Sequence, residues 1–219
     1  LAPDQQPVWP GMEGGLYRPL KDADVQRIHR AALDVLAEIG MADAPPSGIE
    51  YMTRAGAKRE SNGRLTFSRS LIEDMLAGAG RHFVLHGQVP SRDLEPWGKK
   101  VYFGTAGAAV CVVDAETGDY RDSTVRDLYD SARLVDAMEH VHFFLRTMVC
   151  RDIPSPFEMD FNTCYASVKG TTKPVGSSWG DPANMKASIE MLHMIAGGED
   201  KWRARPVGFQ SNCFLQPPL

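Results

Sequence analysis

The feature that most constrains this chain is an alternation, in its second half, of apolar strand-like runs with amphipathic helical stretches. The apolar runs occupy 142–149, 174–179 and 207–213, with centres near residues 145, 176 and 209. Between them, Ser155-Pro156 and Asp181-Pro182 combine an N-cap with a proline at the first helical position. Regular alternation of buried strand and helix is typical of parallel βαβ units with both faces of the sheet covered. The sequence therefore predicts an α/β protein.

The first eighty residues follow a helical pattern instead. Residues 1–19 are rich in Pro and Gly, which favours an extended arm. Across 23–39 the apolar residues fall on one helical face, and Gly40 follows as a stop signal. A shorter helix near 48–55 and another that starts at Ser70 complete this helical region.

The middle of the chain changes from helical to strand-like character. Residues 82–86, 100–104 and 110–114 are strand candidates, and the turn residues of 116–119 predict a hairpin. Thr124 then begins an amphipathic helix. A closed β/α barrel and an open parallel sheet both fit this periodicity, and no glycine fingerprint of the GxGxxG type follows any strand. The pattern alone leaves both architectures open.

Composition excludes several classes of partner. The 24 basic residues are outnumbered by 28 acidic ones, for a net charge of −4, so the basic surface of a nucleic-acid binder is missing. No apolar stretch approaches the roughly 18–20 residues that span a bilayer, and the N-terminal residues do not resemble a signal peptide. We therefore expect a cytoplasmic protein. The first residue, Leu1, is not Met, and the chain stops directly after a strand-like run, which suggests that both ends are cuts.

Several short motifs occur in a fixed order along the chain, at Gly14–Leu20, Phe103–Gly107, Val113–Gly118, Asp122–Thr124 and Leu134–Ala137. Their combination resembles the trimethylamine methyltransferase family of corrinoid-dependent methyltransferases, which includes trimethylamine and glycine betaine methyltransferases. The resemblance covers essentially the whole chain. Each motif is weak by itself, whereas the ordered set is fairly specific.

The resemblance implies a (βα)₈ barrel that moves a methyl group from a methylated amine to the cobalt of a partner corrinoid protein. It implies that no cofactor binds directly, because cobalamin is carried by the partner. Since family members are about twice this length, the resemblance implies that the arm at 1–19 is followed by the N-terminal helical region at 20–80 and, at 81–219, by only half of a TIM-type barrel with about four strands. A quaternary betaine such as glycine betaine is mildly favoured over trimethylamine as the donor, and we expect a homo-oligomer.

A methylated ammonium group is a soft cation, so its site needs aromatic faces, with polar groups for any carboxylate. Barrel enzymes place such sites at the carboxyl ends of their strands. Trp179 lies at such an end, and Phe209 lies on a predicted strand. The predicted substrate-binding residues are Tyr102, Phe103, Thr105, Thr147, Ser177, Trp179, Gln210 and Asn212. Core packing for the aromatic residues, and hydrogen bonding to loop backbone for the polar ones, are the alternative roles.

Other residue groups favour different chemistry. Cys150 and Cys213 end two strands and would allow a zinc-thiolate methyltransferase, although no third ligand is evident. His140 and His142 form a His-x-His pair at the amino end of a strand, the wrong end for a barrel metal site. The acidic residues around 114–122 are typical of a solvated turn. A contrasting hypothesis is a truncated, non-catalytic half-barrel that self-associates through open sheet edges.

Overall fold

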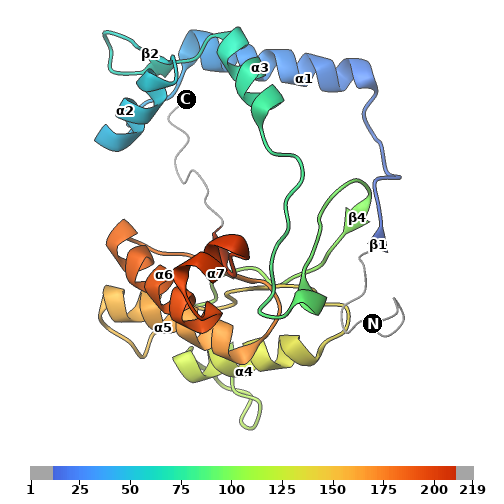
Figure 1. Ribbon diagram of the computed structural model, residues 1–219, viewed down its shortest axis with the longest axis vertical. Coiled ribbons are helices and arrows are strands. Elements are labelled where there is room, and N and C mark those ends of the chain that lie inside the picture. Colours follow the sequence, from blue (N-terminus) through green and yellow to red (C-terminus); the bar gives the residue numbers. More distant parts are fainter. Residues whose placement is uncertain (1–11, 211–219) are drawn as a thin grey trace. The chain divides into compact units, whose positions relative to one another are not determined.

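A computed structural model describes residues 12–210 of the 219-residue chain (Figure 1). It separates into two compact units, one made of residues 15–81 and the other of residues 12–14 and 82–210 within the described range. Helices predominate in the first unit, whereas helices and short strands are mixed in the second. The structure is therefore compatible with the α/β class.

The 15–81 unit is built from helices and one small hairpin. Helix α1 (Asp22–Asp34) continues into a π-helical turn (Val35–Ile39), which confirms the amphipathic helix predicted for 23–39. Gly40 follows with φ of 68°, beside the backbone of the hairpin, where a side chain would collide with the Leu65 carbonyl. The remaining elements are α2 (Pro46–Arg54), β2 (Lys58–Arg59), β3 (Leu65–Thr66) and α3 (Arg69–Gly78). The hydroxyl of Ser68, rather than that of Ser70, caps α3 by accepting from Leu71 N.

A three-stranded parallel sheet lies at the centre of the 82–210 unit. Its strands β7 (Phe144–Leu145), β8 (Val175–Ser177) and β9 (Phe209–Gln210) are neighbours in chain order. Residues 103–109 extend the sheet beyond β7 through parallel bridges from Gly104 to Phe143 and from Ala109 to Met148. Four successive chain segments thus run parallel, each beside the next.

Helices separate the strands where the capping signals predicted them. Helix α4 (Val125–Ala137) starts with a capping box made by Thr124 and Asp127. The other helices are α5 (Pro156–Gly170), capped by Ser155, α6 (Pro182–Ala196), capped by Asp181 and ended by Gly197 at φ 82°, and α7 (Glu199–Ala204). The sequence had not predicted α7. No helix in the described part of the chain is long and apolar enough to cross a membrane.

Three small pieces complete this unit. Strand β1 (Met12–Glu13) pairs with β4 (Lys100–Val101), so part of the predicted arm is ordered by backbone hydrogen bonds. A loop that contains a 3₁₀ turn (Pro90–Arg92) replaces most of the strand predicted at 82–86, with single bridges at Leu85 and His86. The predicted hairpin is formed by β5 (Cys111–Val113) and β6 (Tyr120–Asp122).

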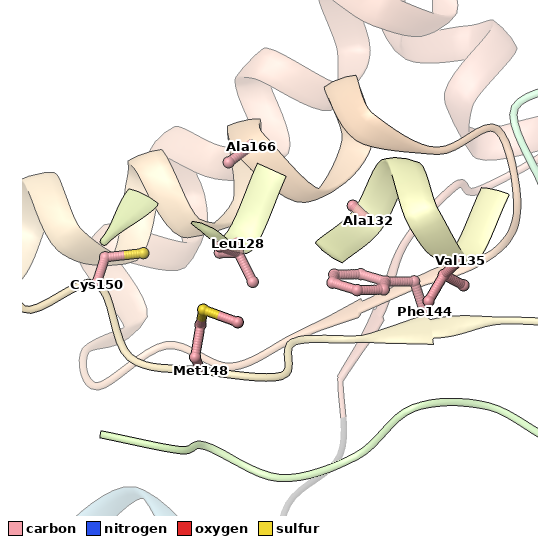
Figure 2. Close-up of a cluster of buried hydrophobic side chains, with 7 residues drawn as sticks. All are labelled: Leu128, Ala132, Val135, Phe144, Met148, Cys150 and Ala166. Atoms are coloured by element: carbon pink, nitrogen blue, oxygen red, sulfur yellow. The ribbon is translucent and has the colours of Figure 1, made fainter. Parts of the chain in front are cut away.

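The core lies between one face of the sheet and the helices. Figure 2 shows Phe144 and Met148 beneath Leu128, Ala132 and Val135 of α4. Ala166 of α5 and Cys150, which precedes that helix, complete this cluster. Full burial of a side chain such as Phe144 stabilises the fold by about 1.5–3 kcal/mol. The α4 face therefore attaches to β7 mainly by apolar contact.

A second cluster continues the same layer. Val175 of β8 contacts Cys164 and Val168 of α5, and Met191 and Leu192 of α6. Because Phe144 and Val175 are register partners, both helix clusters cover the same face of the sheet. The sequence pattern predicts that helices cover both faces of the sheet, but α4, α5 and α6 all pack on this one face. The opposite face carries the half-buried Phe143, Leu145 and Phe209.

A buried lysine joins α4 to the start of β8. Lys173 has no exposed surface, and its Nζ donates to the carbonyls of Val135, Met138 and Val141 at 2.5–2.6 Å. Burial lowers the pKa of this ammonium group to about 8. Beside it, Asp136 accepts from Thr171 and Thr172. The Lys173 bonds supply a donor to carbonyls at and just beyond the end of α4, where a helix runs out of N–H partners.

Replacement of this lysine tests its role. We expect Lys173→Met to reduce the free energy of unfolding by roughly 1–3 kcal/mol, because it leaves buried carbonyls without donors. Urea unfolding followed by circular dichroism measures the change. Lys186→Met, at an exposed position of α6, is the matched control and should change stability by less than about 0.5 kcal/mol. Equal effects of the two substitutions would contradict the proposed role of Lys173.

Candidate functional site

A small aromatic cavity lies where the carboxyl ends of β8 and β9 meet α6 and α7. Its volume is about 140 Å³, several times the roughly 30 Å³ that one water occupies in the liquid. It is lined by Trp179, Met185, Ile189, Leu192, Trp202, Gly208, Phe209 and Gln210. The fold thus brings together Trp179 and Gln210, two of the residues predicted to bind substrate. Trp202 is not among the predicted residues, because the sequence pattern does not indicate the helix α7 that carries it.

Both indole groups are fixed by hydrogen bonds to protein. Trp179 Nε1 donates to the hydroxyl of Ser188 on α6 at 2.8 Å, and Trp202 Nε1 donates to the Val207 carbonyl at 3.0 Å. The ring of His193 lies 4.9 Å from that of Trp202. Both indole N–H groups are therefore bonded to protein and are not free to donate to a ligand. The face of an aromatic ring attracts a soft organic cation.

A buried carboxylate positions the loop that carries Trp179. Asp160 of α5 is 5% exposed, and its Oδ2 accepts from Gly180 N at 2.9 Å and from Asn184 Nδ2 at 2.8 Å. These bonds join α5 and α6 to the residue that follows Trp179. Sequence reasoning did not identify this role, because Asp160 lies within a helix, twenty residues before the loop that it holds.

Three of the predicted polar residues lie on or beside β7 and β8. Thr105 Oγ1 donates to the Leu145 carbonyl at 2.6 Å and accepts from Leu145 N, so it completes the pairing beside β7. Thr147 Oγ1 lies 3.1 Å from Ser131 Oγ on α4. Ser177 is 2% exposed, and its hydroxyl has no hydrogen-bond partner among the residues that the structure describes. These three residues do not line the aromatic cavity.

The predicted aromatic residues Tyr102 and Phe103 lie at the other end of the parallel segments. Phe103 N donates to His142 Nδ1 at 3.0 Å, and the Tyr102 and His142 rings are 5.3 Å apart. Burial lowers the pKa of His142 and favours its neutral form. Hence this histidine of the His-x-His pair has a structural role. Asn212, the last predicted residue, lies outside the described range.

The cysteine and acidic groups have structural surroundings. Cys150 is buried with Sγ 3.6 Å from Thr163 Oγ1, and burial raises the pKa of its thiol. The proposed zinc partner, Cys213, lies outside the described range. Within residues 12–210, no three His, Cys, Asp or Glu side chains are grouped to hold a metal ion. Arg121 of the hairpin pairs with Asp114 and with Asp127 of α4.

Comparison with known proteins identifies the family. The trimethylamine methyltransferase (MTTB) family matches residues 2–219. The chain belongs to this family. A trimethylamine methyltransferase from Desulfitobacterium hafniense is 30% identical over 209 residues, which cover 95% of this chain and 42% of that relative. A glycine betaine methyltransferase from another strain of that species is 27% identical, and the aligned residues cover 87% of this chain and 40% of that relative.

The match within the trimethylamine methyltransferase family includes an archaeal relative. A trimethylamine methyltransferase of Methanosarcina barkeri is 24% identical over 205 residues, 89% of this chain and 40% of the relative. The chain therefore spans about two fifths of the length of the curated relatives it matches. The names of these relatives specify trimethylamine and glycine betaine, and both compounds contain a methylated nitrogen.

The capping box of α4 generates a pH-dependent prediction. Hydrogen bonds from Arg121 and Thr124 hold the pKa of Asp127 far below its usual value, so its contribution to stability is present above the unfolded pKa of about 3.9 and is lost as the pH falls. We expect Asp127→Asn to lower the free energy of unfolding by about 1–2 kcal/mol at neutral pH. This difference should shrink below about pH 4.

Urea titrations at a series of pH values measure this difference. Asp130→Asn is the control, because its ion pair with Arg126 is exposed and should contribute less than about 1 kcal/mol. A difference for Asp127→Asn that stays constant on acidification would show that charge at this position is not the cause.

Proposed function

We propose that this chain is part of an amine methyltransferase that transfers a methyl group from a quaternary or tertiary methylated amine to a corrinoid protein. The observation that carries the proposal is the aromatic cavity at the carboxyl ends of β8 and β9, in a chain of the trimethylamine methyltransferase family. Glycine betaine is the favoured donor, with trimethylamine as the second candidate. The proposal includes a cytoplasmic location.

The same proposal assigns the 82–210 unit to one half of a (βα)₈ barrel. Residues 103–109, β7, β8 and β9 are adjacent in chain order, as barrel strands are, whereas doubly wound open sheets reverse their order. Helices on a single face also support a barrel, because the other face would form its interior. On that face, Gly176 leaves room for Leu145 and Phe209, whose side chains would collide with any Cβ there.

Each part of the cavity has a chemical role in this proposal. The rings of Trp179 and Trp202 bind the methylated ammonium group, and the Gln210 amide donates to the carboxylate of a betaine. Asp160 holds the loop so that the Trp179 ring keeps its orientation. The other predicted substrate contacts, Tyr102, Phe103, Thr105, Thr147, Ser177 and Asn212, stay predictions.

The difficult chemistry belongs to the cofactor. The partner's corrinoid supplies the nucleophile that accepts the methyl group. In the transfer the C–N bond breaks, and the amine keeps the electron pair of that bond. The chain's own residues bind the ammonium group, orient its N–CH₃ bond and exclude water from it. The nitrogen needs no proton donor, because it leaves as a neutral amine when the donor is quaternary.

Calorimetry on the purified chain tests the cavity. We expect glycine betaine to bind more tightly than 3,3-dimethylbutanoate, which has the same shape with carbon in place of the charged nitrogen. Trp179→Leu should weaken betaine binding by roughly tenfold, or about 1.4 kcal/mol, because it removes one π face and keeps apolar bulk.

Trp97→Leu is the matched control, since Trp97 packs on His82 outside the cavity. Equal binding of the two compounds, or no effect of Trp179→Leu, would contradict the assignment of this cavity to the substrate. Trimethylammonium in place of glycine betaine separates the two donor candidates.

A further inference from the structure

The β5–β6 hairpin has one face against the protein body and one face in solvent. It projects beyond α4 as the yellow-green loop in Figure 1. Val112 packs on the core cluster, and Arg121, its register partner, pairs with Asp127 at the start of α4. The opposite face carries Val113 and Tyr120, which face each other across the two strands and are 55% and 82% exposed. An apolar pair this exposed on a projecting hairpin is typical of an interaction surface.

The turn of this hairpin is held in one shape. Asp114 Oδ1 accepts from the backbone N–H groups of Glu116 and Thr117, and Gly118 adopts a φ of 78°. The carboxylates of Glu116 and Asp119 lie in solvent at the tip. The hairpin therefore presents an acidic tip beside a tyrosine anchor, and little conformational entropy remains to be lost on binding.

A groove of opposite charge lies on the same unit, between α4 and α5. It has a volume of about 420 Å³ and is lined by Val125, Arg126, Tyr129, Asn162, Tyr165, Ala166 and Lys169. Lys169 Nζ lies 5.3 Å from the centre of the Tyr165 ring, and the guanidinium of Arg133 lies 5.9 Å from that of Tyr129. Arg126 pairs with Asp130, and Asp152 accepts from the N–H of Val125, which lines the groove. The two tyrosine rings of the groove thus lie beside three cations, Arg126, Arg133 and Lys169, and near two acids.

We propose that the hairpin of one copy of this chain binds the α4–α5 groove of a second copy, in a reciprocal two-fold dimer. Tyr120 enters the groove between Tyr129 and Tyr165, and the acidic tip meets Arg133 and Lys169. Aromatic anchors of this kind dominate interface energetics, and opposite charges set the register.

The position of the two surfaces favours a second copy of this chain as the occupant. The hairpin leads directly into α4. Arg121 of the hairpin pairs with Asp127, two residues after Val125, which lines the groove. Both surfaces therefore lie at the start of α4, so one two-fold axis near that point lets each copy use both. The complementary charges also belong to one chain. This proposal does not depend on the amine cavity or on catalysis.

A charge-swap experiment with the 219-residue chain tests it. Analytical ultracentrifugation should show a concentration-dependent dimer. Arg133→Glu with Lys169→Glu should weaken that dimer by about tenfold or more, and so should Glu116→Lys with Asp119→Lys. A mixture of these two variants should dimerise again, because in the mixed dimer each hairpin meets a groove of opposite charge. Tyr120→Ala, at an exposed position, should also weaken the dimer.

Lys186→Glu with Lys201→Glu, both exposed on other helices, is the control for equal change of net charge. The proposal is overturned if the chain is a monomer at all concentrations, or if a dimer forms that neither charge variant weakens. A dimer lost in both variants and not recovered in their mixture overturns it as well, because the hairpin would then not pair with the groove. Circular dichroism verifies that each variant is folded.

Discussion

Burial of one face of the parallel strands organises the 82–210 unit. Phe144 and Val175 are register partners that point to the same side, and α4, α5 and α6 cover them. This contact sets the order of the strands and therefore the place where their carboxyl ends meet. Lys173 adds a polar connection at the amino end of β8, where it donates to carbonyls at and just beyond the end of α4. Together these contacts position the carboxyl ends of β8 and β9, and thus the aromatic cavity beside them.

In the proposed function, the cavity would bind a cation without a charged side chain among its lining residues. The indole N–H groups of Trp179 and Trp202 are bonded to protein and are therefore not free to donate to a ligand. Asp160 contributes indirectly, because it holds the backbone beside Trp179. The methylated nitrogens in the relatives' names suit such a site, since they offer a soft cation and few hydrogen-bond donors. The α4–α5 groove and the cavity have no lining residue in common.

Residues with similar sequence signals received different roles in the fold. Thr105 and Trp179 both lie beside strands, yet Thr105 pairs with the backbone of Leu145 whereas Trp179 lines a cavity. Thr147 contacts Ser131 on a helix. A hydroxyl can satisfy its own backbone surroundings or a ligand, and the choice depends on which neighbour stands opposite. Sequence alternation limits the possible faces, but it does not name that neighbour.

The sequence by itself determined the local elements: the helix starts at Thr124, Ser155 and Asp181, the stop at Gly197, and the alternation of strand with helix. These depend on groups a few residues apart, which one stretch of chain contains. The tertiary structure alone decided that Trp202 of α7 joins Trp179, that Asp160 holds the loop after Trp179, and that the helices share one face of the sheet. The first two of these contacts join residues twenty or more apart, and only the packing of whole elements brings all three about.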